Sequence, residues 1–363
     1  MMVSPATLEP VLAALDVEPF GSGVQLADGA AIASRYSPHL DVDRPALIAL
    51  NGADLALLAR SLRNAYPAAH PATLVSLADG GVALRPTTLT EMVEVSAPAA
   101  YLYVPALPHP GSVLSLDGVM ATLLSPTGCP WDREQTHLSL RPYLLEETYE
   151  CLDALDAGDM DKLSEELGDL LLQVVFHAQI ATRDGEFGLS DVAGHIISKL
   201  IRRHPHVFGD VEVADAEGVT RNWERLKAAE RAKKGERAAN PFAGIVLALP
   251  ALSRAQEIQR RAARYGFAWP SREGAWAKLQ EEFAEWQAAQ TAAERAAEFG
   301  DMLFALANVA LWDNVDGESA LREANNRFTR RFSDILAELE AGGADPHALT
   351  GDEWLARWGR GTA

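Results

Sequence analysis

Two short acidic runs, about one helix length apart, contain the residues in this chain that are best suited to bind a metal ion. The first run contains Glu147 and Glu150, and the second contains Glu166 and Asp169. In a helix, residues three or four positions apart lie on one face, so each pair would project its two carboxylates together. If the two helices pack antiparallel, four carboxylates converge, and without a bound cation they would repel one another.

The same two-part pattern recurs in the second half of the chain. Glu282 and Glu285 lie in one predicted helix, and Glu298 and Asp301 lie in the next. A solvated helix face would explain a single acidic run. Two copies of a two-part pattern favour a functional site instead.

The donors in both copies are carboxylate oxygens alone. Oxygen ligands in this number suit hard divalent cations, Mg²⁺ above all and Mn²⁺ as a second candidate, which keep water ligands and bridge to phosphate oxygens. We therefore predict one metal site per copy, and the predicted metal ligands are Glu147, Glu150, Glu166 and Asp169 in the first copy and Glu282, Glu285, Glu298 and Asp301 in the second.

A glycine directly precedes the aspartate in each copy, at Gly168 and Gly300. Glycine inside a helix costs roughly 1 kcal/mol relative to alanine. Its recurrence predicts that another backbone or a ligand approaches the helix closely at this point.

Composition and charge limit the classes of function. The chain has 363 residues, 48% of them hydrophobic and 23% charged, which is ordinary for a globular protein of two or three domains. Its formal charge of −19 argues against nucleic acid and anionic membranes as partners, since both require a basic surface. The chain has two cysteines without paired spacing, and it shows no apolar run of membrane-spanning length and no targeting segment. These features predict a cytoplasmic protein.

The chain divides by pattern into a short α/β part and a longer helical part. Apolar runs over 46–50, 72–77 and 99–104 predict buried strands, and Asp54–Tyr66 predicts a helix between two of them. The rest is helical, and a segment rich in proline and glycine over 235–250 separates its two halves. The expected fold is mainly α, with a small α/β domain at 1–110 followed by two tandem all-α helical domains at 115–236 and 245–363.

Apolar residues at helical spacing predict which face of each acidic helix is buried. In the first copy a largely apolar stripe contains Leu145, Tyr149, Leu152 and Asp156, turned away from the acids. In the second copy the predicted buried residues are Trp276, Leu279, Phe283 and Trp286.

A basic helix follows each acidic pair. The recurring positions are Lys199, Arg202 and Arg203 in the first copy and Arg327, Arg330 and Arg331 in the second, with Trp223 and Trp358 at matching places beyond them. Arginine donates two parallel hydrogen bonds to phosphate oxygens, so the repeated spacing favours phosphate binding over simple stabilisation of a helix C-terminus. Core closure is the preferred role for Trp223.

These acids, the basic helix and the loop GCPWDREQTH at 128–137 together resemble the MazG family of nucleoside triphosphate pyrophosphohydrolases. The family pattern is EExxE followed by ExxD. In this chain it occurs at Glu146, Glu147, Glu150, Glu166 and Asp169. It occurs a second time at Glu281, Glu282, Glu285, Glu298 and Asp301. The resemblance spans about residues 115–360. It implies an all-α NTP-pyrophosphohydrolase fold assembled as a homodimer, and Mg²⁺-dependent hydrolysis of NTP or dNTP to nucleoside monophosphate and pyrophosphate.

The resemblance also implies roles for single residues. Glu146 and Glu281, one residue from the ligand pairs, are the catalytic candidates that would orient or deprotonate the attacking water; an outward-facing surface glutamate is the alternative for each. The predicted substrate-binding residues are Asn325, Arg327, Arg330, Arg331 and Trp358 in the second copy and Lys162, Lys199, Arg202 and Arg203 in the first. Asn325, Arg327 and Arg330 favour the second copy as the main catalytic one, although it has Glu294 where the first has Lys162.

The α/β part has a resemblance of its own. The segments NAYPAAHPATLVSL and YLYVPAL, which begin at Asn64 and Tyr101, resemble the closing half of tetrapyrrole (SAM-dependent) methylase domains. The half that would supply most of the cofactor site is not recognisable, so we expect a degenerate remnant without methyltransferase activity.

Three other functions are compatible with parts of the pattern. A di-iron carboxylate bundle would require Glu-x-x-His pairs, whereas this chain has Glu-x-x-Asp. A non-catalytic regulator that senses nucleotides or alarmones would not need so many ligands. A scaffold that recruits a partner through residues 1–110 is the third alternative.

Overall fold

The structure is a computed structural model, and it describes residues 5–360 apart from 19–20, 22, 79–80, 96–97, 212–214, 216–217, 220–221, 224–225 and 227–239. The chain forms two compact units, residues 1–200 and 201–363, and each is described by itself. Most of the helix expected over 217–234 lies outside the described residues. Among the described helices, none is both long and apolar enough to span a membrane.

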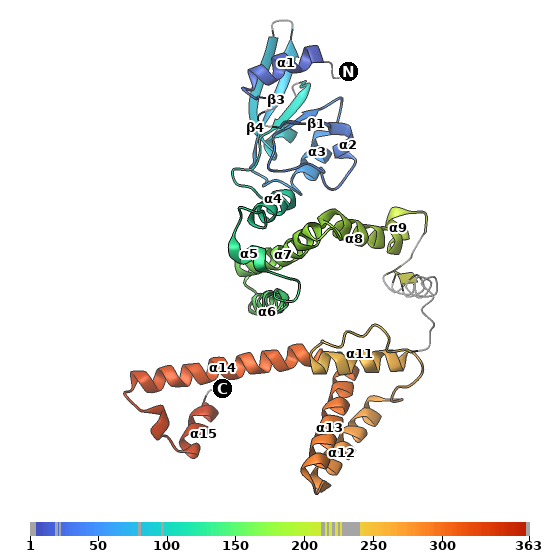
Figure 1. Cartoon of the computed structure of the whole chain (residues 1–363), viewed down its shortest axis with the longest axis vertical. Helices are drawn as coiled ribbons and strands as arrows, with labels where there is room; N and C mark the ends of the chain where they lie inside the picture. Colours follow the sequence, from blue (N-terminus) through green and yellow to red (C-terminus); the bar gives the residue numbers. More distant parts are fainter. Residues whose placement is uncertain are drawn as a thin grey trace. The chain divides into compact units, whose positions relative to one another are not determined.

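A five-stranded mixed sheet forms the N-terminal part of the first unit (Figure 1). Its strands lie in the order β1-β2-β5-β3-β4, and only β1 and β2 pair in parallel. The bounds are β1 (Gln25–Asp28), β2 (Ala46–Ala49), β3 (Pro71–Ala78), β4 (Gly81–Thr88) and β5 (Tyr101–Val104). The three predicted strands are confirmed as β2, β3 and β5, whereas β1 and β4 were not predicted.

Apolar residues on both faces of this sheet are buried under helices. Helices α2 (Gly29–Ala33) and α3 (Leu55–Leu62) and the 3₁₀ turn η1 (Glu91–Glu94) cover one face, where Ile48 and Leu102 are fully buried. On the other face Val11 of α1 (Pro5–Ala14) packs with residues such as Leu47 and Val75. Burial on both faces explains why β2 reads as a continuous apolar run.

Asp43 joins this sheet to the first helix that follows it. Its carboxylate accepts hydrogen bonds from the backbone N–H groups of Gly111, at 2.7 Å, and Ser112, at 3.0 Å, and from the hydroxyl of Ser115. Although partial burial opposes the effect, these hydrogen bonds lower the pKa of Asp43 to about 2. Asp43 therefore fixes the start of α4 (Val113–Leu123).

The remaining helices of the first unit are α5 (Pro130–Glu134), α6 (Arg141–Ala157), α7 (Met160–Arg183) and most of α8 (Leu189–Arg203), whose last three residues belong to the second unit. Helices α6 and α7 form a tight hairpin, because Gly158 adopts a left-handed conformation with φ of 68° and Asp159 caps the start of α7. Met120 of α4, Leu140, and Phe176 and Ile180 of α7 form the core beneath it.

The second unit contains a similar helical hairpin. Its described elements are α9 (Pro205–Phe208), α11 (Ala251–Ala263), α12 (Arg272–Ala288), α13 (Ala292–Trp312), α14 (Gly317–Ala341), η2 (Pro346–Ala348) and α15 (Gly351–Arg360). Helices α12 and α13 pack against each other, and a capping box between Thr291 and Glu294 starts α13. Helix α14 contacts α11 and α15, and Figure 1 shows it running away from the hairpin.

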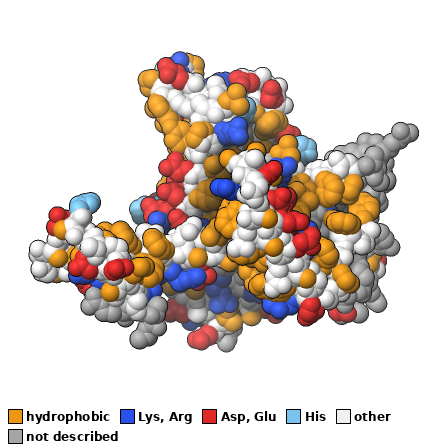
Figure 2. Space-filling model, turned by 90° about the horizontal axis from the view of Figure 1, so that it is seen from below, with side chains coloured by type: hydrophobic (Ala, Val, Ile, Leu, Met, Phe, Trp, Pro, Cys, Tyr) orange, Lys and Arg blue, Asp and Glu red, His pale blue; other side chains and the backbone are white. Residues whose placement is uncertain are grey.

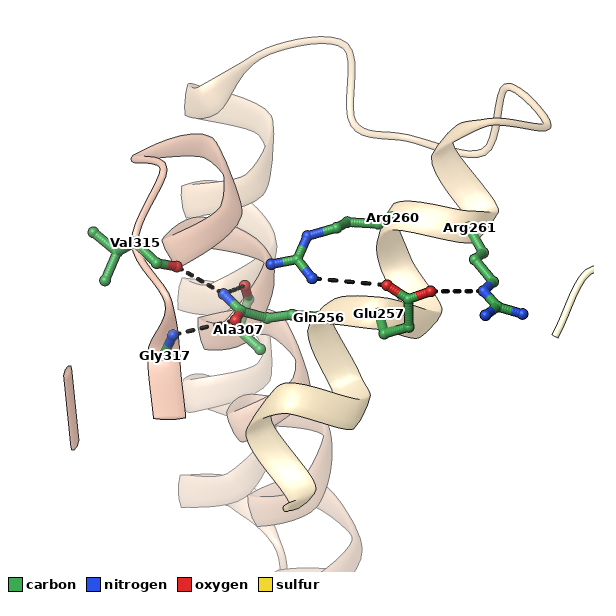
Figure 3. A network of polar contacts seen from close by, with 7 residues as sticks. All are labelled: Gln256, Glu257, Arg260, Arg261, Ala307, Val315 and Gly317. Atoms are coloured by element: carbon green, nitrogen blue, oxygen red, sulfur yellow. Dashed lines mark hydrogen bonds and ion pairs between the residues drawn. The ribbon is translucent and has the colours of Figure 1, made fainter. Parts of the chain in front are cut away.

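Gln256 holds the junction where α13 ends and α14 begins (Figure 3). This fully buried side chain of α11 donates to the carbonyl oxygens of Val315, at 2.9 Å, and Ala307, at 3.4 Å. Its oxygen accepts from the N–H of Gly317 at 3.2 Å. One amide thus bonds to backbone groups within α13, in the connection that follows it and at the start of α14.

The predicted burial of the large apolar stripes on the acidic helices is wrong for most of their members, whereas Leu152, Leu279 and Trp286 are half-buried. Leu145 and Tyr149 on α6 are 57% and 39% exposed, and Trp276 and Phe283 on α12 are 39% and 45% exposed. Apolar side chains are visible at the surface in several patches of Figure 2. The packed faces contain small residues instead, Cys151 and Ala154 on α6 and Ala275 on α12, which allow the helices to approach closely.

The mainly helical fold with a small α/β part is as expected. The division at residue 200 differs from the predicted boundaries, and the three-domain organisation stays a prediction.

Candidate active site and metal centres

The first hairpin brings three glutamates together. Glu147 and Glu150 of α6 and Glu166 of α7 each offer a carboxylate oxygen, and these oxygens lie within 4.8 Å of one another. Glu166 is only 7% exposed. The acids lie on the packed face of α6, next to Cys151 and Ala154, and therefore point towards α7.

The second hairpin repeats this arrangement. Glu282 and Glu285 of α12 and Glu298 of α13 also offer oxygens within 4.8 Å of one another, and Glu282 is 7% exposed. The two aspartates predicted as fourth ligands are close by. The charge of Asp169 acts on Glu147, and Asp301 lines a cavity together with Glu282.

The carboxylates repel one another in both hairpins. Burial, followed by the charges of Asp169 and Glu150, raises the pKa of Glu147. Burial and the charge of Glu282 raise the pKa of Glu285. A bound cation would relieve this repulsion, and the closely spaced oxygen-only donors fit a hard divalent ion.

A lysine lies against each cluster. The Lys162 ammonium is 3.7 Å from a carboxylate oxygen of Glu166 on the same helix. In the second hairpin the Lys278 ammonium is 2.7 Å from Glu281 and 2.8 Å from Glu282, and these contacts raise the pKa of Lys278. Lys278 was not predicted, although its place three and four residues before Glu281 and Glu282 was a visible signal.

The two candidate catalytic glutamates lie at the edges of the clusters. Glu146 is exposed, and its charge contributes to the raised pKa of Glu147. The Glu281 side chain is 57% exposed and pairs with Lys278. Both therefore remain candidates next to the ligand groups, and both are accessible to solvent.

Of the predicted substrate-binding residues, Lys162 lies beside the acids, whereas those of α14 do not. Arg327 pairs with Glu323 of its own helix at 2.7 Å, and the Arg330 Nε donates to the carbonyl oxygen of Asn326. The Arg331 guanidinium lies 4.3 Å from the centre of the Trp358 ring, and Asn325 is exposed. These residues follow the course of α14 away from the hairpin (Figure 1).

The basic residues of α8 are placed in a comparable way. Lys199 and Arg202 are exposed, and the Arg203 guanidinium lies 5.8 Å from the centre of the Trp223 ring. Trp223 is 42% exposed, so its predicted role in closing the core is wrong.

One smaller expectation is corrected in part. A Cβ at Gly168 or Gly300 would meet no protein atom within 4 Å, so no backbone among the described residues approaches these glycines, and the approach of a ligand stays a prediction. In the first hairpin His177 stacks on His137, with ring centres 5.0 Å apart and the two Nδ1 atoms 2.7 Å apart.

Comparisons with known proteins agree with this geometry. The model of the MazG nucleotide pyrophosphohydrolase domain matches residues 135–208, which include the whole first acidic hairpin. Fold and site thus place the chain among helical nucleotide pyrophosphohydrolases. A nucleoside triphosphate pyrophosphohydrolase/pyrophosphatase MazG of Thermotoga maritima is 46% identical over 63% of this chain and 87% of that protein. The chain therefore belongs to the MazG family.

Further relatives show the same similarity. The nucleoside triphosphate pyrophosphohydrolase of Escherichia coli K12 is 44% identical over 62% of this chain and 88% of that protein. The uncharacterized protein YabN of Bacillus subtilis is 45% identical over 60% of this chain and 45% of its own length.

Proposed function

We propose that this chain hydrolyses nucleoside triphosphates, ribo or deoxy, to nucleoside monophosphate and pyrophosphate, with Mg²⁺ as the cofactor. The convergence of three glutamates in each hairpin is the observation that carries the proposal. It is supported by relatives whose names describe nucleoside triphosphate pyrophosphohydrolases. The biological role would be the removal of unwanted nucleotides from the cytoplasmic pool.

The residues that would hold the metal are those of the two clusters. These are Glu147, Glu150 and Glu166, with Asp169 nearby, and Glu282, Glu285 and Glu298, with Asp301 nearby. When bound, a divalent ion lowers the pKa of a coordinated water and neutralises phosphate charge. The raised pKa values of Glu147 and Glu285 show that the acids lack full compensation on their own.

The chain's own residues supply the remaining functions. Lys278 carries a positive charge beside Glu282 and can bind a phosphate oxygen from there. Glu281 and Glu146 are solvent-accessible and can orient a water or take its proton. Arg327 and Arg330, if brought to the site, would bind the leaving phosphates with planar guanidinium groups.

We further propose that the two hairpins belong to tandem domains and that the chain forms a homodimer. The large apolar residues left exposed on the acidic helices support a homodimer, because a second chain could cover them. The second hairpin is the better catalytic candidate, because a cavity adjoins its acids.

A non-catalytic nucleotide or alarmone sensor is the competing function. A sensor would bind nucleotides without releasing pyrophosphate. Pyrophosphate release with and without Mg²⁺ separates the two functions directly.

The decisive experiment measures pyrophosphate release from a panel of canonical and oxidised NTPs and dNTPs. The wild type is compared with Glu150→Gln, Glu285→Gln and the control Asp153→Asn, which removes an exposed acid from α6 outside the cluster. We expect Glu285→Gln to lose most of the activity and Asp153→Asn to retain it. Full activity in Glu285→Gln together with none in Glu150→Gln would place the main site in the first hairpin.

A further inference from the structure

An open pocket of about 540 Å³ lies beside strand β1 in the α/β part of the first unit. Its walls are β1, helix α2 and the segment that follows α2. The described residues that line it lie outside both acidic hairpins. The pocket is therefore separate from the proposed hydrolytic site and requires an explanation of its own.

Strand β1 has an open side at this pocket. It is the first strand in the order β1-β2-β5-β3-β4, and no described strand pairs with its other side. The Gln25 N–H donates to the carbonyl oxygen of Pro45, just before β2, at 2.9 Å. Because the backbone groups of successive residues point to opposite sides of a strand, the N–H and C=O of Leu26 point to the open side. Such an edge can pair with a strand of another chain.

The two edges of the sheet differ in their protection against such pairing. Strand β4, at the opposite edge, contains Pro86, which has no backbone N–H to donate. Strand β1 contains no proline, and Leu26 in its middle is 59% exposed. The edge beside the pocket is therefore the one that is available to a partner.

Two arginines give the pocket a positive charge that the described residues do not balance. Arg35 and Arg44 line the pocket, are exposed and form no ion pair with a described residue. Asp28 is the one acid in the described lining, and its two oxygens accept from the Ala31 N–H at 2.8 Å and the Asn51 amide at 3.2 Å. In a chain with a formal charge of −19, this local positive charge favours an anionic partner.

Hydrogen bonds hold the backbone of both arginines at the pocket. The Arg44 Nε donates to the carbonyl oxygen of Gly23 at 2.8 Å, and the Arg44 carbonyl oxygen accepts from the Gln25 side chain at 3.1 Å. The carbonyl oxygen of Arg35 accepts from Arg60 of α3 at 3.0 Å. Groups that are already in place lower the entropic cost of binding a partner.

We infer that the edge of β1 binds an extended acidic segment of another protein, which adds a strand to the sheet. Main-chain groups of this segment would pair with Leu26, and its carboxylates would bind Arg35 and Arg44. A small anion would suit the arginines but would leave the backbone groups of Leu26 without a partner. The β1 strand of a second copy would bring its own two arginines next to these, which disfavours self-pairing.

The two faces of β1 predict the side-chain pattern of the partner. Ala27 packs on the face that α2 and α3 cover, whereas Val24 packs on the opposite face with Val11 of α1. Leu26 alternates with Ala27 and therefore shares the face of Val24. A segment that alternates acidic and apolar residues would place its carboxylates on the face of α2, where Arg35 follows, and its apolar side chains beside Leu26.

The test measures binding of a fluorescein-labelled peptide, Glu-Val-Glu-Val-Glu with an amidated C-terminus, to the full-length chain by fluorescence anisotropy. We expect saturable binding that Arg35→Gln weakens by about 3- to 10-fold. The matched control is Arg85→Gln, which removes the same charge from β4 and should leave the Kd unchanged. No binding at about 1 mM peptide, or an equal loss in both variants, would overturn the inference.

Two N-methylated peptides test the backbone pairing separately from charge. Only alternate N–H groups of an added strand face its neighbour, so methylation of either the valine or the glutamate nitrogens should abolish binding, and methylation of the other set should not. Equal affinities for the two methylated peptides would contradict strand addition. A single-stranded oligonucleotide that competes with the unmodified peptide at equal affinity would assign the arginines to phosphate binding and overturn the inference as well.

The inference is independent of the proposed function. Arg35→Gln should leave pyrophosphate release from NTPs unchanged, because Arg35 lies in the α/β part and outside both hairpins. Failure of the wild type to release pyrophosphate would refute the proposed function and leave the β1 edge as a binding site. Failure to bind the peptide would refute only the assignment of the β1 edge.

Discussion

Replacing Gln256 by leucine should loosen the junction between α13 and α14. The side chain is fully buried and of similar size to leucine, so the substitution removes hydrogen bonds and leaves most of the packing. The carbonyl oxygen of Val315 and the N–H of Gly317 lose their partner, whereas the contact to the Ala307 oxygen is already long at 3.4 Å. An unpaired buried backbone group costs about 1–3 kcal/mol, which gives about 2–6 kcal/mol for two. Because both hydrogen bonds are only partly buried, we expect a cost in the lower part of this range, about 2–4 kcal/mol.

The matched control is Gln290→Leu. Gln290 is exposed, and within the described contacts its side chain donates only to the carbonyl oxygen of Ala288, so its replacement should change stability by less than about 0.5 kcal/mol. The two variants thus differ in the burial of the lost amide.

Hydrogen exchange is the appropriate assay, because a chain with two compact units will not unfold in a single two-state step. A loss of 2–4 kcal/mol corresponds to about 30- to 700-fold faster exchange at the Gly317 amide and in the last turn of α13. Equal protection of this segment in Gln256→Leu and Gln290→Leu would refute the role assigned to Gln256.

Three further predictions concern pH. Burial and neighbouring acids raise the pKa of Glu147. In the metal-free protein its stabilising contribution is therefore present at low pH and is lost as the pH rises through the raised pKa. Glu147→Gln or added Mg²⁺ should flatten this part of the plot of Tm against pH. Asp43, with its pKa near 2, should stabilise the protein above about pH 4 and lose that contribution as the pH falls towards 2, and Asp43→Asn should lower Tm at pH 7 and remove this dependence. Burial and His137 lower the pKa of His177, so its contribution is lost as the pH falls below about 6.5, and His177→Gln should make Tm less sensitive between about pH 5 and 7.

The sequence allowed prediction of the elements that have strong local signals. The apolar runs of β2, β3 and β5 were recognisable because both faces of the sheet are covered. The convergence of the acids followed from their helical spacing. These features can be predicted from residues that are close together in the sequence, without information about contacts to distant segments.

Strand β4 lacks such a signal. Residues Gly81–Thr88 are largely exposed and include Pro86, so their composition does not resemble a buried strand. They form a strand because β3 pairs with them along its whole length. This pairing is a tertiary effect that composition does not show.

The buried face of the acidic helices was predicted wrongly for a related reason. Hydrophobicity selects large apolar residues such as Tyr149 and Trp276 for the interior, but the helices pack through Ala154 and Ala275 next to the acids. A functional site reverses the usual pattern, because polar groups must face the partner helix there. The direction in which α14 leaves the hairpin could not be predicted from the sequence either, since the spacing of residues along a helix does not give the direction of its axis.

The two hairpins reach the same charge balance by different routes. Where the first has Lys162, the second has Glu294, whose carboxylate is engaged in starting its helix. Where the second has Lys278, the first has Tyr143. The compensating ammonium has thus moved to the opposite helix, and each set of four acids still has one lysine beside it. An anionic inhibitor shaped to bind one cluster from the side of its lysine would meet carboxylates, and no lysine, on the corresponding side of the other cluster. A single compound should therefore inhibit one hairpin and leave the other active.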